Sequence, residues 1–360
     1  MKHRQVDIGR LAVINTDGHA IGVDIGAGSV RAAVLAPGTL DGRPSVTVHG
    51  LGQVELPPNA VVNGVVVDQA AVTQALKSLW ASHKFECRRV ILGITNQQVV
   101  VRDLTVPNLE PEQLAKALPY QAREVVPLPM DQALIDFMPL GGVDEATDTI
   151  AGLLVAAPRG PVLSAVQAVE RAGLSVARVD LSSFAVLRSI ADQRLAVEAV
   201  IDIGAHMTSI VVHNQGVPKV VRVVPRGGQE LTQLLVARGE LSEPEAELAK
   251  RAEGLIGSNP KIVDVLSQGV RPILSEIRSS IQYFTSMNPG ARLEQISLSG
   301  GGALLPGLAE ELAEQVGVPT RVITPMHHIS NRFTGQGAKP SMDETAASAV
   351  SVGLAMGAAA

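Results

Sequence analysis

Residues 23–27 read VDIGA, and residues 201–205 read IDIGA, so four of the five positions are identical in two distant parts of the chain. Each stretch ends a run of aliphatic residues, and each is followed by a second such run, over 30–35 and over 208–212. This pattern predicts a strand, a tight glycine turn and a returning strand. We therefore expect an α/β protein whose second half repeats the first, with two related lobes facing one cleft.

An aspartate precedes the glycine turn in both copies, as Asp24 and Asp202. Glycine allows the backbone N–H groups of such a turn to approach an oxyanion closely, and phosphate is the guest that this arrangement favours. The two carboxylates, Asp24 and Asp202, would hold the waters of a Mg²⁺ ion. The alternative for either loop alone is an ordinary hairpin with a surface aspartate. The expected phosphate-contacting residues are Gly26, Ala27, Gly28 and Ser29 in the first loop, and Gly204 and Ala205 in the second.

Three consecutive glycines, Gly300, Gly301 and Gly302, follow the strand-like run 296–299, and a helix is expected to begin over 303–308. A strand that runs into a glycine loop and a helix N-terminus lets a flat base and ribose, or a phosphate, lie close to the backbone. The alternative is a plain linker, which would be unusual directly after so apolar a strand. The sequence thus supplies a third loop of the kind that binds nucleotides.

The overall composition limits the class of protein. With 360 residues, 46% of them apolar and 18% charged, and a net charge of −5, the chain is expected to be soluble and globular, with two domains or one body split by a cleft. Thirty Lys and Arg against 35 Asp and Glu, with 2% aromatic residues, disfavour nucleic-acid binding. The single cysteine, Cys87, fits a reducing, cytoplasmic compartment. No apolar run approaches the ~20 residues of a membrane helix, so direct membrane insertion is not expected.

Hydrophobic periodicity predicts the order of elements between these motifs. A β-meander is expected over 21–25, 30–36 and 45–55. A helix is expected from its N-cap Asp68 to about Trp80. The remaining expected elements are a buried strand at 90–94, a helical stripe over 114–126 despite Pro119, a helix at 161–172, a strand at 175–179 and a helix at 182–193.

The three glycine motifs, in this order, resemble the phosphate 1, phosphate 2 and adenosine motifs of the actin-like ATPase superfamily. One branch fits better than the rest, because the segment 117–129 (ALPYQAREVVPLP), continued by 133–137 (ALIDF), resembles the PilM family of type IV pilus assembly, which is related to FtsA. The stretches 62–68 (VNGVVVD) and 226–232 (RGGQELT) resemble the same family. The resemblance covers about residues 21–358.

The resemblance implies an actin-like ATPase fold, in which two related lobes surround a nucleotide cleft and the first carries a small inserted α+β subdomain. It divides the chain into a lead-in at 1–20, a first lobe at 21–87, 159–197 and 340–360, an inserted peptide-binding subdomain at 88–158, a second-lobe core at 198–230 and 290–339, and an outer subdomain of the second lobe at 231–289.

The resemblance also implies ATP and Mg²⁺ as cofactors and assigns further site residues. Glu247, Lys250 and Arg251 match positions that flank the adenosine, and their spacing places them on one helix face; a solvated charged face with internal pairs is the alternative. Asp180 matches the residue that orients the attacking water, or else caps the helix at 182–193. Arg31 stands where phosphate 1 is usually basic.

The phosphate 2 loop departs from the superfamily pattern. His206 and Met207 replace small residues there, although Thr208 retains a hydroxyl that could meet phosphate. Because the bulkier pair crowds the loop, we expect binding of ATP with at most weak hydrolysis.

The implied partner is the N-terminal cytoplasmic tail of a PilN-like membrane protein, which would recruit the chain to the inner face of the cytoplasmic membrane; pilus motor components are a further class. The tail is expected in a groove between the first lobe and the inserted subdomain. Leu114, Leu118, Val125 and Val126 would line it, unless they face the core of their own subdomain.

Two other functions of the superfamily remain open, an FtsA-like filament-forming division protein and a small-molecule kinase. The stretch 345–360 contains no Lys or Arg, unlike the basic amphipathic helix that ends FtsA-type proteins. No loop near Asp202 clusters the Asp, Asn and His residues expected of a kinase.

Overall fold

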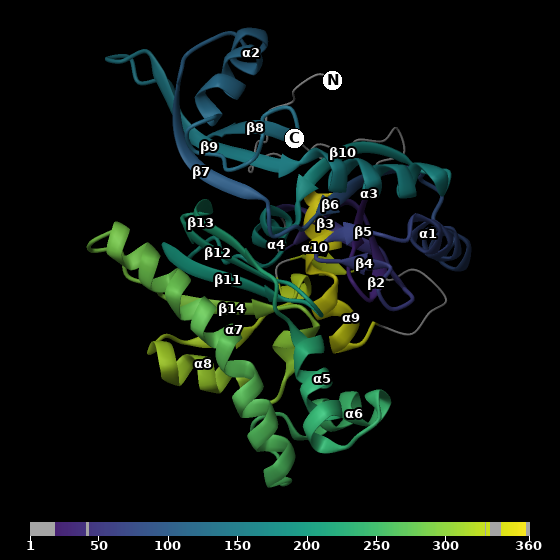
Figure 1. Ribbon diagram of the computed structural model, residues 1–360. Coiled ribbons are helices and arrows are strands. Elements are labelled where there is room, and N and C mark those ends of the chain that lie inside the picture. The colour runs from purple at the N-terminus through teal and green to yellow at the C-terminus, as the bar shows by residue number, and fades with distance from the viewer. Residues whose placement is uncertain (1–18, 41–42, 328, 332–339, 358–360) are drawn as a thin grey trace.

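The computed structural model describes residues 19–40, 43–327, 329–331 and 340–357 (Figure 1). All of the expected lead-in at 1–20 except its last two residues lies outside these ranges. The chain forms two sheet-containing lobes and a smaller three-stranded unit at one end (Figure 1).

The first lobe is built on a six-stranded sheet with the order β10-β6-β1-β2-β3-β16. Its antiparallel meander consists of β1 (Ala20–Ile25), β2 (Ser29–Leu40) and β3 (Arg43–Glu55). Parallel strands β6 (Arg89–Ile94) and β10 (Ser175–Leu181) extend it beside β1, and β16 (Ser330–Asn331) pairs with β3 at the other edge. The meander predicted from the first motif is therefore confirmed.

The second lobe repeats this topology in a five-stranded sheet with the order β13-β12-β11-β14-β15. Here β11 (Val197–Ile203), β12 (Thr208–Asn214) and β13 (Val217–Val224) form the antiparallel meander. The parallel strands are β14 (Gln295–Ser299) and β15 (Thr320–Val322). In both sheets a meander is followed by two strands parallel to its first strand, so the repeat of residues 23–27 reflects a repeat of the fold.

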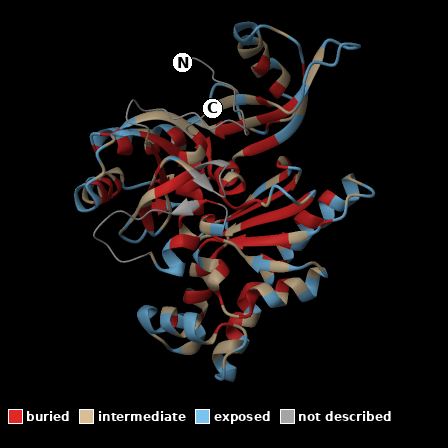
Figure 2. Ribbon diagram, turned by 180° about the vertical axis from the view of Figure 1, so that it is seen from behind, coloured by how far each residue is buried: buried red, intermediate tan, exposed pale blue. Residues whose placement is uncertain are grey.

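Helices cover both faces of the first sheet. Helices α1 (Gln69–His83) and α3 (Arg159–Arg171) pack on one face, together with the hairpin of β4 (Val61–Val62) and β5 (Val65–Val66). Helices α4 (Ser182–Ile190) and α10 (Ala349–Met356) pack on the other. The second sheet places Val200 and Val211 in the same buried cluster as α4 and α10, so one hydrophobic core joins the lobes (Figure 2).

The outer face of the second sheet carries the remaining long helices. Helix α7 (Pro260–Met287) lies along β12 and β13, with α5 (Gly228–Gly239) beside it. Helix α6 (Glu243–Glu253) contacts both α5 and α7, and α8 (Leu308–Val316) packs on β15. Short helix α9 (Met342–Ala347) leads back to the first lobe, and a 3-10 turn (Pro325–His327) precedes β16. None of the helices among the described residues combines the length and the apolar character that crossing a membrane requires.

The inserted subdomain is an antiparallel sheet, β7-β9-β8, with one helix. Its elements are β7 (Val100–Pro107), α2 (Pro111–Ala122), β8 (Ala133–Pro139) and β9 (Thr149–Pro158). The predicted start at residue 88 is wrong, because β6 pairs with β1 and belongs to the first sheet. The second-lobe range 290–339 is also corrected, since β16 pairs with β3. Both errors concern non-local strand pairing, which a local pattern does not determine.

Three predicted helix ends are also corrected. Helix α2 tolerates Pro119 but ends at Ala122 rather than at 126, and α4 ends at Ile190 rather than at 193. The glycine loop does not lead straight into a helix: a 3-10 turn (Gly301–Leu304) comes first, and α8 begins only at Leu308.

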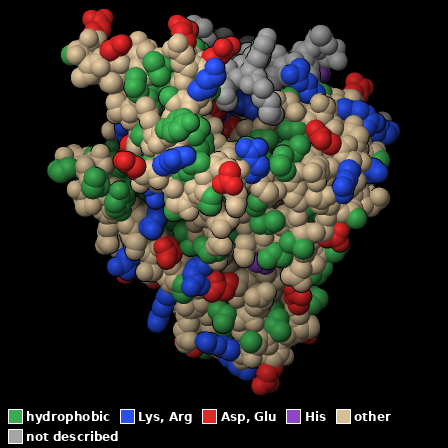
Figure 3. Space-filling view, turned by 45° about the horizontal axis from the view of Figure 1, so that its top comes forward, with side chains coloured by type: hydrophobic (Ala, Val, Ile, Leu, Met, Phe, Trp, Pro, Cys, Tyr) green, Lys and Arg blue, Asp and Glu red, His purple; other side chains and the backbone are tan. Residues whose placement is uncertain are grey.

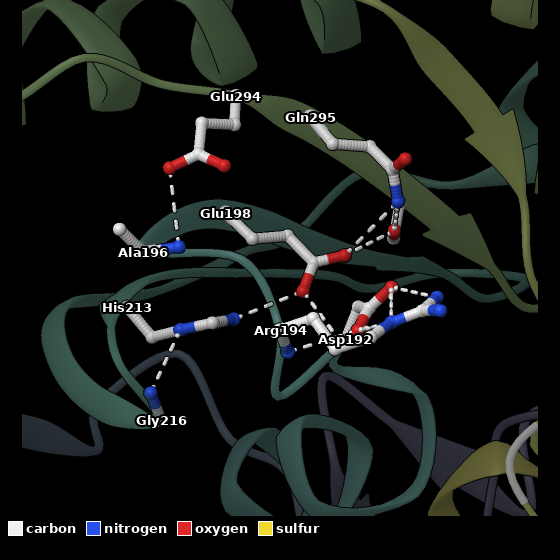
Figure 4. A network of polar contacts seen from close by, with 9 residues as sticks. Asp192, Arg194, Ala196, Glu198, His213, Gly216, Glu294 and Gln295 are labelled. Atoms are coloured by element: carbon white, nitrogen blue, oxygen red, sulfur yellow. Dashed lines mark hydrogen bonds and ion pairs between the residues drawn. The ribbon is translucent and has the colours of Figure 1, made fainter.

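A buried polar network holds the linker between the lobes, residues 191–196 (Figure 4). Glu198 and His213 face each other on paired strands and are fully buried, with Glu198 Oε2 3.0 Å from His213 Nε2. The backbone N–H of Gly216 donates to His213 Nδ1 over 3.1 Å, so the ring proton lies on Nε2 and is donated to Glu198. The same Glu198 oxygen accepts the N–H of Asp192 over 2.8 Å, and Ser297 donates to the other oxygen. The linker is thereby fastened to the second lobe.

Candidate functional site

The two glycine loops have the same backbone geometry. Gly26 N–H donates to the carbonyl of Ser29 over 2.9 Å, and Gly204 N–H donates to the carbonyl of Met207 over 2.9 Å. The flanking strands close with Ile25 opposite Val30 and with Ile203 opposite Thr208. Each loop is therefore a four-residue turn at the carboxyl end of the first strand of its meander.

The aspartates before the loops come from different lobes, and Asp24 is close enough to affect the ionisation of Asp202. Burial raises the pKa of Asp24, and the Arg31 guanidinium, 3.5 Å from its carboxylate, opposes that rise. Burial and the neighbouring Asp24 raise the pKa of Asp202 to about 7, again against the influence of Arg31. Two buried carboxylates with raised pKa values, one of them raised in part by the other, fit a site that a hard cation would stabilise.

The first loop also carries a buried hydroxyl group that is available to a ligand. Ser29 is buried, and its hydroxyl has no hydrogen-bond partner among the residues that the structure describes. The position of a Cβ on Gly28 has no atom within 4 Å, so the loop backbone is accessible. Within the part of the chain that the structure describes, no group of three or more His, Cys, Asp or Glu could hold a metal. A Mg²⁺ ion held by Asp24 and Asp202 would therefore take its other ligands from phosphate and water.

The second loop is supported from behind by the start of α5. Gly228 N–H donates to the carbonyl of Gly204 over 2.9 Å, and Gln229 N–H donates to that of Ala205 over 2.8 Å. The expected phosphate contact from Thr208 is corrected, because its buried hydroxyl donates to the Arg226 carbonyl over 2.8 Å. Thr208 thus supports the loop from inside the second lobe.

The third glycine loop lies against the second. Gly300 has a positive φ of 84°, and a Cβ there would lie 2.5 Å from the Ile203 carbonyl oxygen, so the position requires glycine. A Cβ on Gly228 would lie 3.7 Å from Gly302 Cα and 3.8 Å from Lys250 Nζ. The glycine loop, the start of α5 and the side of α6 therefore converge, as a shared nucleotide site requires.

The charged residues of α6 lie beside this loop, but their charges are paired. Lys250 Nζ donates to Glu247 over 2.6 Å, to the Thr232 hydroxyl over 2.8 Å and to the Gly228 carbonyl over 3.1 Å. Arg251 donates to the other Glu247 oxygen over 2.9 Å. Partial burial opposes ionisation of Glu247, but the hydrogen bonds from Lys250 and Arg251 outweigh it and lower its pKa to about 2. The internally paired face is thus what forms, and Lys250 ties α6 to α5.

Asp180 is the penultimate residue of β10 and lies inside the first lobe. One carboxylate oxygen accepts the Leu181 N–H over 2.8 Å, and the other pairs with Arg188, which also donates to the Gly353 carbonyl of α10 over 3.0 Å. The N-cap alternative is wrong, because Leu181 precedes α4 and no side chain caps that helix. With both oxygens engaged, Asp180 joins β10 to Arg188, which in turn joins α4 to α10, and the role of Asp180 in orienting water stays a prediction.

The expected partner-binding stripe is corrected. Leu118 and Val126 are buried, and Leu114 and Val125 are half-buried against the same cluster, which includes Leu154 of the inserted sheet. The four side chains form the core of their own subdomain, the second of the two possibilities that the sequence allowed.

A pocket does lie between the first lobe and the inserted subdomain, lined by other residues. Its space, including the opening to solvent, measures about 380 Å³. Ile25 of β1, Ile94 of β6, Ala157 of β9 and Val162 of α3 contribute to its mostly apolar wall. Asn96 adds a polar group whose amide donates to the Asn63 carbonyl over 3.3 Å. No local sequence pattern predicts this set, because its members come from separate segments.

The sequence also missed Asp343, which pairs with Arg251 across 92 positions of the chain. The only local signal is the capping box of Ser341 and Glu344, which starts α9 and places Asp343 in its first turn.

The sequence model of the family described as "Type IV pilus assembly protein PilM" matches residues 22–359. The chain belongs to the PilM family. A chain of the solved structure described as a PilM-PilN type IV pilus biogenesis complex is similar to it, with 26% identity, a TM-score of 0.78, and coverage of 93% of this chain and 97% of that chain. This outcome confirms the resemblance drawn from the segment 117–129 and its companions.

More distant proteins share the fold of this PilM family member. Ethanolamine utilization protein EutJ from Carboxydothermus hydrogenoformans is 17% identical with a TM-score of 0.53, covering 96% of this chain and 92% of its own. MreB 5 of Spiroplasma citri bound to AMPPNP is 14% identical with a TM-score of 0.51, covering 94% and 95%. Cell division protein FtsA of Bacillus subtilis (strain 168) is 23% identical over 85% of this chain and 78% of that protein. The predicted actin-like ATPase fold is thus confirmed, and PilM membership favours pilus assembly over the FtsA-like and kinase alternatives.

Proposed function

We propose that this PilM family member binds Mg²⁺-ATP in the cleft between its lobes. The observation that carries the proposal is the convergence of Asp24 and Asp202, with raised pKa values, beside the unpartnered Ser29 hydroxyl. The two carboxylates would hold the ion, the turns at 26–29 and 204–207 would face the phosphates, and the loop at 300–302 would face the adenosine. The ion, when bound, would neutralise the charge shared by the carboxylates and the phosphates.

Nucleotide in this proposal acts mainly as a structural ligand that sets the angle between the lobes. Asp180 engages both carboxylate oxygens inside the first lobe, which supports at most weak hydrolysis. His206 is exposed and Met207 half-buried at the tip of the second loop, where both add bulk.

The proposed partner is the cytoplasmic tail of a PilN-like membrane protein, bound in the apolar pocket between the first lobe and the inserted subdomain. Support comes from the match to a PilM-PilN complex and from the pocket's position at the predicted boundary. Ile25 lines the pocket and directly follows Asp24, so the partner site and the phosphate 1 loop share one strand end. Through this partner the chain would be cytoplasmic and recruited to the inner face of the membrane.

Calorimetry with Mg²⁺-ATP and with a synthetic peptide of a PilN-like tail tests both sites. Asp24→Ala should lower the affinity for Mg²⁺-ATP at least tenfold, because it removes one of two carboxylates at the ion. Val99→Trp fills the pocket with an apolar ring and should lower the peptide affinity at least tenfold while nucleotide binding remains. Equal nucleotide affinities for Asp24→Ala and the unmodified chain would contradict the cleft assignment.

A matched control exists for the pocket variant. Val143 is an exposed valine in the β8–β9 loop, at the opposite end of the same three-stranded sheet. Val143→Trp should leave peptide binding unchanged. Normal peptide binding by Val99→Trp, or an equal loss in both variants, would place the partner elsewhere.

A further inference from the structure

An ion pair connects two segments that border the expected adenosine position. Arg251 of α6 pairs with Asp343 of α9, and both side chains are about half exposed, at 58% and 52%. The hydrogen bond to Glu247 has the largest effect on Arg251 and raises the pKa of its guanidinium. Partial burial opposes this rise, and Asp343 adds to it. Among the described residues this is the one ion pair that joins α6 to α9.

The pair closes a ring of contacts around the glycine loop. On one side, Lys250 fastens α6 to the Gly228 carbonyl at the start of α5, and Gly228 in turn holds the second phosphate loop. On the other side, α9 is fastened to the glycine loop, because Gly300 N–H and the Ser299 hydroxyl both donate to the Ala346 carbonyl over 3.2 Å. Helix α6 is therefore fixed at its inner side through buried contacts and at its outer side through an exposed ion pair.

The far end of α6 is fixed as well. Leu255 N–H donates to the Pro306 carbonyl over 2.8 Å, which joins the end of this helix to the segment after the glycine loop. Of the contacts that close the ring, the hydrogen bonds of Lys250 and Ser299 are part-buried and buried and resist opening, whereas a solvent-exposed ion pair contributes little and is screened by salt. The exposed Arg251–Asp343 ion pair is therefore the contact of this ring that opens most easily.

We propose that Asp343 is a further residue of the nucleotide site, and that its ion pair with Arg251 is a latch that slows the entry and release of the adenosine moiety. The inference rests on the proposed nucleotide function and adds a residue that sets residence time. Asp343 acts through Arg251 and is a positioning residue. Its expected signature is kinetic, because opening the latch speeds both association and dissociation and changes the equilibrium affinity less.

Stopped-flow release of a fluorescent ATP analogue, loaded with Mg²⁺ and chased with excess ATP, tests the latch. Asp343→Asn should raise the dissociation rate about three- to fivefold at low ionic strength, the size that one exposed ion pair can carry. In the unmodified chain the dissociation rate should rise with salt toward that of the variant, whose own rate should change little. Asp343→Glu, which keeps the charge, should release slowly.

The matched control is Asp264→Asn. Asp264 is an exposed aspartate of α7 that accepts a hydrogen bond from Gln268 on the same helix. It should release nucleotide at the unmodified rate with the unmodified salt dependence. Unchanged release by Asp343→Asn, or the same salt dependence in both proteins, would overturn the latch alone. Failure of the unmodified chain to retain the analogue would overturn the nucleotide function and the latch with it.

Discussion

Binding of Mg²⁺-ATP should depend on pH through Asp202, whose pKa burial and the nearby Asp24 raise to about 7. A magnesium ion takes ionised carboxylates, so binding of the ion must release the proton that Asp202 holds below pH 7. The affinity should therefore rise as the pH rises through 7. Asp202→Asn removes this titration and keeps the shape of the side chain.

The size of the effect follows from the raised pKa. A group with a pKa of about 7 is about one tenth ionised at pH 6 and about nine tenths ionised at pH 8. If only the ionised form accepts the ion, the affinity of the unmodified chain should increase about tenfold between these two values, relative to Asp202→Asn. A phosphate group also titrates, with a second pKa of about 6, but this contribution is common to both proteins.

Fluorescence titration with Mg²⁺-ATP at pH 6, 7 and 8 measures the ratio. With a chelator in place of magnesium the sign should reverse for the unmodified chain, because a protonated Asp202 repels the phosphates less than an ionised one. Parallel pH profiles for the unmodified chain and Asp202→Asn would refute the assignment of Asp202 to the ion site.

Two further predictions concern stability. Leu118→Glu should lower the free energy of unfolding, measured by urea titration, by about 3–5 kcal/mol, because it places a carboxylate in the core of the inserted subdomain. The control Leu248→Glu, on the exposed side of α6, should change this free energy by less than about 0.5 kcal/mol. A Leu118→Glu protein as stable as the unmodified chain would show that this stripe is not core. His213→Ala should lower the free energy of unfolding by about 3–5 kcal/mol, because it leaves the buried Glu198 without its imidazole partner. The control His206→Ala, in an exposed loop, should leave this free energy nearly unchanged. Equal effects of the two substitutions would contradict the network of Figure 4.

The sequence predicted the parts of the fold that depend on neighbouring residues. The glycine turns after Asp24 and Asp202 were recognisable because a turn needs its glycine where the strand ends, and both strands are nearly continuous runs of buried residues. Helix α1 begins after the predicted N-cap Asp68, whose carboxylate accepts the Ala71 N–H over 2.9 Å. In these cases the residues that decide the structure lie within a few positions of one another.

The parts that the sequence did not predict depend on contacts between distant segments. An amphipathic stripe such as the one containing Leu118 shows that one helix face is buried but not what covers it. The apolar sequence of β6 predicts a buried strand but fits the first lobe and the inserted subdomain equally well. Only its pairing with β1 assigns it to the first lobe. Basic and acidic side chains are interspersed on the face shown in Figure 3, so charge pattern alone does not single out a functional surface there.

The position of Ile25 suggests how the two proposed sites communicate. Its backbone closes the first glycine hairpin opposite Val30, while its side chain contributes to the pocket beside the inserted subdomain. In the proposed function, a shift of the turn at 26–29 toward a bound phosphate would reach one wall of the pocket through this residue. On the second lobe, Glu198 holds the linker at the amino end of β11 while Asp202 lies at the carboxyl end of the same strand, so this strand spans the distance from the cleft to the linker. A nucleotide that draws Asp24 and Asp202 together would thus act on a strand end that borders the partner pocket and on a strand that is anchored at the linker. Such a coupling between nucleotide and partner would require no contact between the two ligands.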